Sequence, residues 1–178
     1  MAFHKRIEIQ PGFCILWAFL ILTLPMKFLV SALAAAIFHE ACHVIAVRCL
    51  GGRILNMTIA AGGMFMEVSE LDAKGEMLCA LAGPLGSLIL AVLPFPALAL
   101  CGLVQGLFNL LPIMPLDGGR ILGSFLEMTM PKHRGKIEIC IEALLLMGAS
   151  HLGSWAVLLW LCLVFRKFPC KPWGKRVQ

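Results

Sequence analysis

The strongest chemical signal in the sequence is a pair of histidines four residues apart, in the pentapeptide His39-Glu40-Ala41-Cys42-His43. Residues four apart share one face of a helix, so both imidazoles can point at one metal ion. This spacing suits zinc, and Glu40 is placed to act as a base on water at the metal. The surrounding helix is apolar, where ionisable side chains are costly and indicate a functional site. The alternative is a hydrogen-bonded cluster that only ties helices together.

A catalytic zinc site needs a third protein ligand, because such sites take three and leave one position open. The candidates are Asp117, Glu138, Glu142 and His151. Asp117 ends the stretch Asn109–Asp117, which contains two prolines that must disrupt helical hydrogen bonding. Broken backbone at membrane depth is tolerated where protein buries it or a wet cavity receives it, so Asp117 can turn inward. We favour Asp117 as the ligand; the alternative is that it caps the next helix.

The other candidates are weaker. Glu138 lies one turn after Arg134, so a salt bridge between them is expected instead of a catalytic role. Glu142 lies deeper in the apolar segment and keeps a possible role at the site. His151 is expected in an outer turn and is weak as a ligand.

Composition indicates where this chemistry takes place. The chain has 178 residues, of which 60% are hydrophobic and only 14% charged. A soluble domain of this size cannot hide so much apolar surface, and disorder is excluded for the same reason. The net charge of +5 comes from small basic clusters beside apolar runs, as in membrane topology signals, so nucleic-acid binding is not expected. Eight cysteines include no C-x-x-C pair and suggest no disulfide framework.

Apolar stretches predict a helical polytopic membrane protein. The candidate spans are residues 13–25, 28–50, 76–93, 97–111 and 137–165. The last is either one long helix or two short ones broken at residues 148–153. With the N-terminus in the cytoplasm, six spans place every Lys and Arg except Lys27 on the cytoplasmic side. We therefore predict six transmembrane helices, both termini in the cytoplasm, and the two histidines towards the cytoplasmic end of their helix.

Residues 53–68 differ from the apolar stretches. Two short β-prone runs flank Gly62-Gly63, which is typical of a two-residue hairpin loop. The alternative is a plain cytoplasmic loop. A hairpin here can offer its edge to an extended substrate strand, or it can merely plug the site.

Together, the pentapeptide 39–43 and the segment 109–119 resemble the site-2 protease family of intramembrane zinc metalloproteases. The form of the second motif looks most like the bacterial sporulation branch, which processes a membrane-tethered pro-sigma factor. The resemblance covers about residues 28–130. It implies a three-helix catalytic core that opens to the cytoplasmic side of the bacterial cytoplasmic membrane.

The resemblance also implies residue roles. One zinc ion per chain would be held by His39, His43 and Asp117, with Glu40 as the catalytic base. Asn109 would contact the substrate near the scissile peptide and help to stabilise the oxyanion.

The chain departs from the family pattern in one place. Family members often carry Gly-Pro-x-x-Asn in the third span, and here Gly83-Pro84 is followed by Ser87 at the Asn position. We expect this change to affect packing or substrate contacts and not the metal. Residues 1–178 are expected to form a single membrane-embedded domain without PDZ or CBS domains, so a regulator would be another membrane protein acting in trans.

The sequence thus predicts a zinc endopeptidase that hydrolyses a peptide bond in or near the membrane segment of a tethered protein substrate. A sporulation sigma-factor precursor is the most specific candidate, through the resemblance alone. Two other classes remain. A metal transporter should carry ligands on several helices across the bilayer, whereas these cluster at one depth. An inactive binding module should have lost the base or a ligand, and none is lost.

Overall fold

The structure is a computed structural model that describes residues 6–60, 63–69 and 71–151, which form six helices and three strands. In chain order they are β1 (Arg6–Ile9), α1 (Pro11–Thr23), α2 (Met26–Cys49), β2 (Arg53–Ala60), β3 (Gly63–Ser69), α3 (Ala73–Leu90), α4 (Pro96–Asn109), α5 (Asp117–Thr129) and α6 (Arg134–His151).

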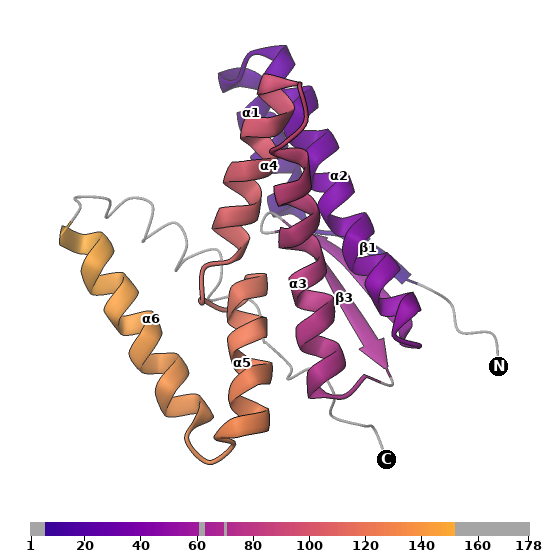
Figure 1. Ribbon diagram of the computed structural model, residues 1–178. Coiled ribbons are helices and arrows are strands. Elements are labelled where there is room, and N and C mark those ends of the chain that lie inside the picture. The colour runs from indigo at the N-terminus through magenta and orange to yellow at the C-terminus, as the bar shows by residue number, and fades with distance from the viewer. Residues whose placement is uncertain (1–5, 61–62, 70, 152–178) are drawn as a thin grey trace.

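Helix α3 lies at the centre, between α2 and α4, and α5 packs against its first half (Figure 1). Small residues permit this close packing. A Cβ atom on Gly86 would overlap Sγ of Cys42 on α2, and one on Gly102 of α4 would lie 2.7 Å from the carbonyl oxygen of Ser87. The close packing brings the backbone of α3 directly against the histidine-bearing face of α2.

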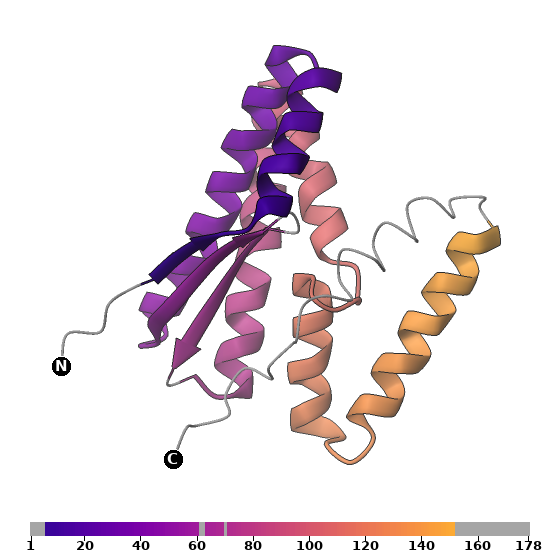
Figure 2. The same cartoon turned by 180° about the vertical axis from the view of Figure 1, so that it is seen from behind.

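A small sheet lies beside the lower part of α2 and α3, with the strands in the order β1-β2-β3 (Figure 2). Strands β2 and β3 form the predicted antiparallel hairpin, in which Ala60 pairs with Gly63. Gly63 therefore begins a strand, at φ +119°, whereas we expected it in the turn. Strand β1 pairs in parallel with β2 and was not predicted.

Prolines set the boundaries around the second motif. Pro96 begins α4, a position where its missing N–H costs nothing. The segment 110–116 then carries Pro112 and Pro115, cannot continue α4, and folds back before Asp117 begins α5. Helix α5 continues below α4, and α6 leans away from it after a short turn (Figures 1 and 2).

Many large apolar side chains face outward. Helix α1 has no buried residue, although its sequence is almost entirely apolar. Exposed apolar surface of this extent is stable in lipid and not in water. Two described helices, α2 and α3, are long and apolar enough to cross a membrane, and α1 and α4 are shorter apolar helices.

The helices match the predicted spans only in part. Those predicted over 13–25, 28–50, 76–93 and 97–111 correspond to α1, α2, α3 and α4. Helix α5 was not predicted as a helix of its own. Helix α6 continues through residues 148–151, where a break was considered, and the rest of the last predicted span lies outside the described residues.

Candidate metal centre

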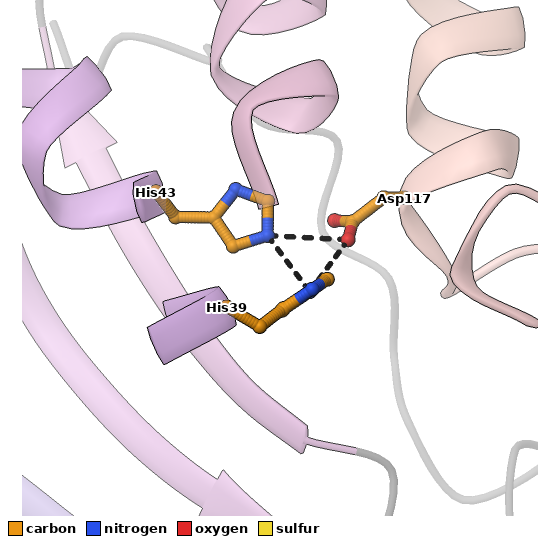
Figure 3. A group of neighbouring side chains, drawn as sticks. All are labelled: His39, His43 and Asp117. Carbon is orange, nitrogen blue, oxygen red and sulfur yellow. Dashed lines mark hydrogen bonds and ion pairs between the residues drawn. The ribbon is translucent and has the colours of Figure 1, made fainter. Parts of the chain in front are cut away.

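Three side chains from two helices meet at one buried point. His39 and His43 lie one turn apart on α2, and Asp117 is the first residue of α5. The two histidines are 3% exposed and Asp117 is 6% exposed. Figure 3 shows both imidazoles and the carboxylate pointing at one another. The prolines before Asp117 break the helix, as predicted, and the chain then turns the Asp117 carboxylate towards α2.

The distances between the three ligand atoms fit one zinc ion. Nε2 of His39 and Nε2 of His43 each lie 3.1 Å from Oδ2 of Asp117, and the two nitrogens are 3.2 Å apart. Tetrahedral zinc with ligands at about 2.0–2.1 Å separates ligand atoms by about 3.3 Å. The three atoms therefore already stand where zinc would hold them.

The protonation pattern of the imidazoles also fits a cation. Nδ1 of His43 lies 2.7 Å from the Cys79 carbonyl oxygen, which can only accept, so Nδ1 carries the proton. In the neutral ring Nε2 is then an acceptor, and it faces another acceptor on Asp117. Such lone pairs repel one another unless a cation lies between them. Two histidine nitrogens and one carboxylate oxygen form a ligand set that is found in catalytic zinc sites.

Gly83 of α3 makes room for the imidazoles. A Cβ atom at this position would overlap Nε2 of His43 and would lie 2.8 Å from Cε1 of His39. The helix backbone therefore forms the floor of the metal centre. This role of Gly83 was not predicted from the sequence.

The second carboxylate oxygen of Asp117 has its own partner. Nη1 of Arg120 lies 3.4 Å from Oδ1, one turn further along α5. Oδ2 remains directed at the two histidines. The ion pair with Arg120 therefore favours the Asp117 rotamer in which only Oδ2 is available to bind the metal. The tight fold of the preceding segment holds this geometry, since a Cβ atom on Gly119 would lie 2.6 Å from the Ile113 carbonyl oxygen.

Glu40 lies beside the ligands and is held by the hairpin. Its Oε1 accepts a hydrogen bond of 3.0 Å from the Met64 backbone N–H on β3. Its Oε2 is buried and has no hydrogen-bond partner within the described part of the chain. A carboxylate with one oxygen fixed and the other unpaired is arranged to accept a proton from a reacting group.

Replacing Met64 with proline tests this support. Met64 donates to Glu40 from the outer edge of β3, where proline is tolerated, so Met64→Pro removes one hydrogen bond and no ladder bond. We expect cleavage to slow about 10- to 150-fold, since a hydrogen bond to a charged group contributes roughly 1.5–3 kcal/mol, while zinc affinity stays unchanged. Met64→Leu keeps the N–H and is the control. Equal cleavage rates for the two variants would contradict the role.

The remaining predicted residues are not among the three clustered ligands. Glu138 forms the expected salt bridge with Arg134, with Oε1 and Nε 2.9 Å apart. Glu142 is not part of the ligand cluster, and its Oε1 lies 3.4 Å from the Met114 backbone nitrogen in the folded-back segment. Nδ2 of Asn109 donates to the Gln105 carbonyl, 3.0 Å away, and keeps a second N–H. The side chain of His151 lies outside the described residues.

Ser87 corrects one expectation. We expected its difference from the family pattern to leave the metal untouched, but its Oγ lies 2.8 Å from Nδ1 of His39 and its side chain is fully buried. The signal was present in the sequence as the spacing of Cys79, Gly83 and Ser87, each four residues apart and hence on one helix face. From the sequence we had expected this face to contribute to packing or substrate contacts only.

Comparisons with known proteins agree with this site. Residues 92–149, which include Asp117, match the profile of Peptidase family M50. The chain is 28% identical over 109 residues to a zinc metalloprotease of Methanocaldococcus jannaschii, which covers 52% of this chain and 32% of that protein. It is also 28% identical over 162 residues to stage IV sporulation protein FB of Bacillus subtilis. This alignment covers 80% of this chain and 56% of that protein. The chain thus spans about a third to just over half of these relatives.

The fold has a counterpart of known structure, the site-2 protease from Methanocaldococcus jannaschii. The TM-score is 0.68 at 23% identity, and the match covers 100% of this chain and 94% of the other. The chain is therefore similar in fold, in ligand set and, over part of its length, in sequence to the M50, or site-2 protease, zinc metalloproteases. His39, His43 and Asp117 form its zinc site.

Proposed function

We propose that this protein is an intramembrane zinc endopeptidase that cuts a membrane-tethered protein in or near its membrane segment. The observation that carries the proposal is the position of Glu40. It adjoins three buried zinc ligands, and its Oε2 is buried without a partner among the described residues. A structural cluster gains nothing from an unpaired carboxylate oxygen, because such an atom is costly to bury.

The chain's own residues account for the chemistry. When bound, zinc supplies a Lewis acid that polarises the scissile carbonyl and acidifies water at the site. Glu40 takes a proton at Oε2 as water attacks that carbonyl, and then delivers it to the leaving nitrogen. Asn109 retains one N–H that can donate to the oxyanion. The three ligands are buried in protein, which keeps the local dielectric constant low and strengthens these interactions.

Substrate helices hide their peptide bonds in hydrogen bonds, so a segment must unwind before it is cut. Strand β3 is at the edge of the sheet, and its Met64 N–H points at Glu40. The outer edge of β3 therefore faces the base, which favours pairing with an extended substrate over a hairpin that only plugs the site.

The arrangement of the strands supports the predicted orientation. Strand β1 pairs with β2, so the N-terminal strand and the hairpin after α2 lie on the same side of the membrane. Basic residues gather at this end: Arg53, Lys74, Lys132, Arg134 and Lys136. By the positive-inside rule this end is cytoplasmic, and we propose that the site opens there.

The proposed substrate class is a tethered precursor. The similarity to stage IV sporulation protein FB over 80% of the chain supports a sporulation transcription-factor precursor as the specific candidate. Residues 1–178 would act as one catalytic domain, regulated by a membrane protein in trans.

Quantitative membrane proteomics in the native host tests the proposal. Wild type is compared with Asp117→Ala, which loses a zinc ligand, and with Glu40→Gln, during growth and sporulation. We expect the same tethered precursor to accumulate in both variants, and the purified wild-type protein to cut it in a zinc-dependent way. If no protein accumulates under any condition while the purified protein still binds zinc, the endopeptidase assignment is wrong and metal binding or transport takes its place.

A further inference from the structure

We infer that Ser87 is a positioning residue that orients the zinc ligand His39 and thereby sets the affinity of the metal centre. The inference rests on the zinc site and not on the proteolytic activity. Ser87 belongs to α3, which supplies no zinc ligand itself.

The contact between Ser87 and His39 is short and fully enclosed. Oγ lies 2.8 Å from Nδ1, and Ser87 is 0% exposed while His39 is 3% exposed. Both residues are therefore closed off from bulk solvent in the folded protein. The imidazole nitrogen therefore has Ser87 as its partner or loses a buried hydrogen bond, which costs roughly 1–3 kcal/mol.

The hydrogen bond also decides which nitrogen of His39 binds the metal. Nε2 faces Asp117 and His43, so it must carry the lone pair that binds zinc. The proton then sits on Nδ1 and is donated to Ser87 Oγ. Partners of this kind fix the tautomer and ring orientation of a metal-binding histidine and raise its basicity.

One helix provides this support for both histidines. His43 donates from Nδ1 to the carbonyl of Cys79, and His39 bonds to Ser87, two helical turns later. Gly83 lies midway and leaves space for both rings. The Cys79 partner is backbone and cannot be removed by changing a side chain, so Ser87 is the support that mutation can test.

Zinc binding to purified protein in detergent provides the experiment. Ser87→Ala removes only the hydroxyl and leaves nearly the same volume, so the fold is preserved. We expect zinc affinity, measured by competition with a chelator, to fall about 10- to 100-fold, as for other partners of metal-binding histidines. The visible absorption of the Co²⁺-substituted protein should also change, because the ring is no longer held in one orientation.

Ser124→Ala is the matched control. Ser124 is 5% exposed and lies on α5, and it is not one of the residues bonded to a zinc ligand. This variant should bind zinc like wild type and give the wild-type Co²⁺ spectrum. If Ser87→Ala also binds zinc within twofold of wild type with an unchanged Co²⁺ spectrum, Ser87 only packs α3 and the inference is wrong.

Discussion

Gly83→Ala is expected to abolish zinc binding and, with it, any cleavage. The added methyl group would occupy the space of His43 Nε2 and would press on Cε1 of His39. The neighbouring atoms belong to rings fixed by hydrogen bonds to Cys79 and Ser87, so neither ring can move aside without losing a buried partner. Metal analysis of the purified variant should find less than a tenth of the wild-type zinc content, as expected when two of three ligands are displaced.

Gly135→Ala is the control for this substitution. Gly135 lies in the first turn of α6, and a Cβ atom there meets nothing within 4 Å. The change should leave zinc content unaltered and stabilise the helix slightly, by about 0.5–1 kcal/mol. Size-exclusion chromatography in detergent checks that both variants remain folded. A folded Gly83→Ala protein with a full complement of zinc would show that α3 does not approach the imidazoles so closely.

Glu40→Gln should separate catalysis from metal binding. The amide keeps the size of the carboxylate, and its oxygen still accepts from the Met64 N–H. The variant should therefore bind zinc as wild type does. The glutamine side chain cannot take up a proton. We therefore expect the cleavage rate of the purified precursor to fall about 10²- to 10⁴-fold, the usual contribution of a general base. Single-turnover cleavage and chelator competition on the same preparation measure the two effects.

Asp117→Ala provides the contrast, since it should lose zinc and cleavage together. The two variants therefore differ only in the metal assay. If Glu40→Gln keeps more than a tenth of the wild-type cleavage rate, another group acts as the base.

The zinc centre was largely predictable because its main signals are local. A spacing of four on an apolar helix places His39 and His43 on one face, and the prolines before Asp117 require a break that frees its carboxylate. The hairpin was predictable from two β-prone runs around glycines. Each of these patterns lies within one short stretch of the chain and follows from helix and turn geometry.

Other features depend on contacts between distant segments, which no local pattern contains. Strand β1 pairs with a strand about fifty residues later, and Ser87 bonds to a histidine 48 residues before it. The hydrogen bond from Met64 to Glu40 uses a backbone group, which is the same in every residue except proline. The separate helix α5 follows from tertiary packing against α3 after the chain has folded back.

The difference between the two supports on α3 has an evolutionary consequence. His43 is held by a carbonyl that any amino acid at position 79 would supply, whereas His39 is held by a side chain and both rings need glycine at position 83. Position 79 is buried, so it can vary only among side chains that fit this space, but any of them keeps the hydrogen bond to His43. Substitutions accepted at positions 83 and 87 should be few and coupled to changes in the histidine-bearing helix. A search for related proteins that scores side-chain identity would therefore detect the hydrogen bond between Ser87 and His39. It would miss the one between the Cys79 carbonyl and His43, because that bond uses the backbone.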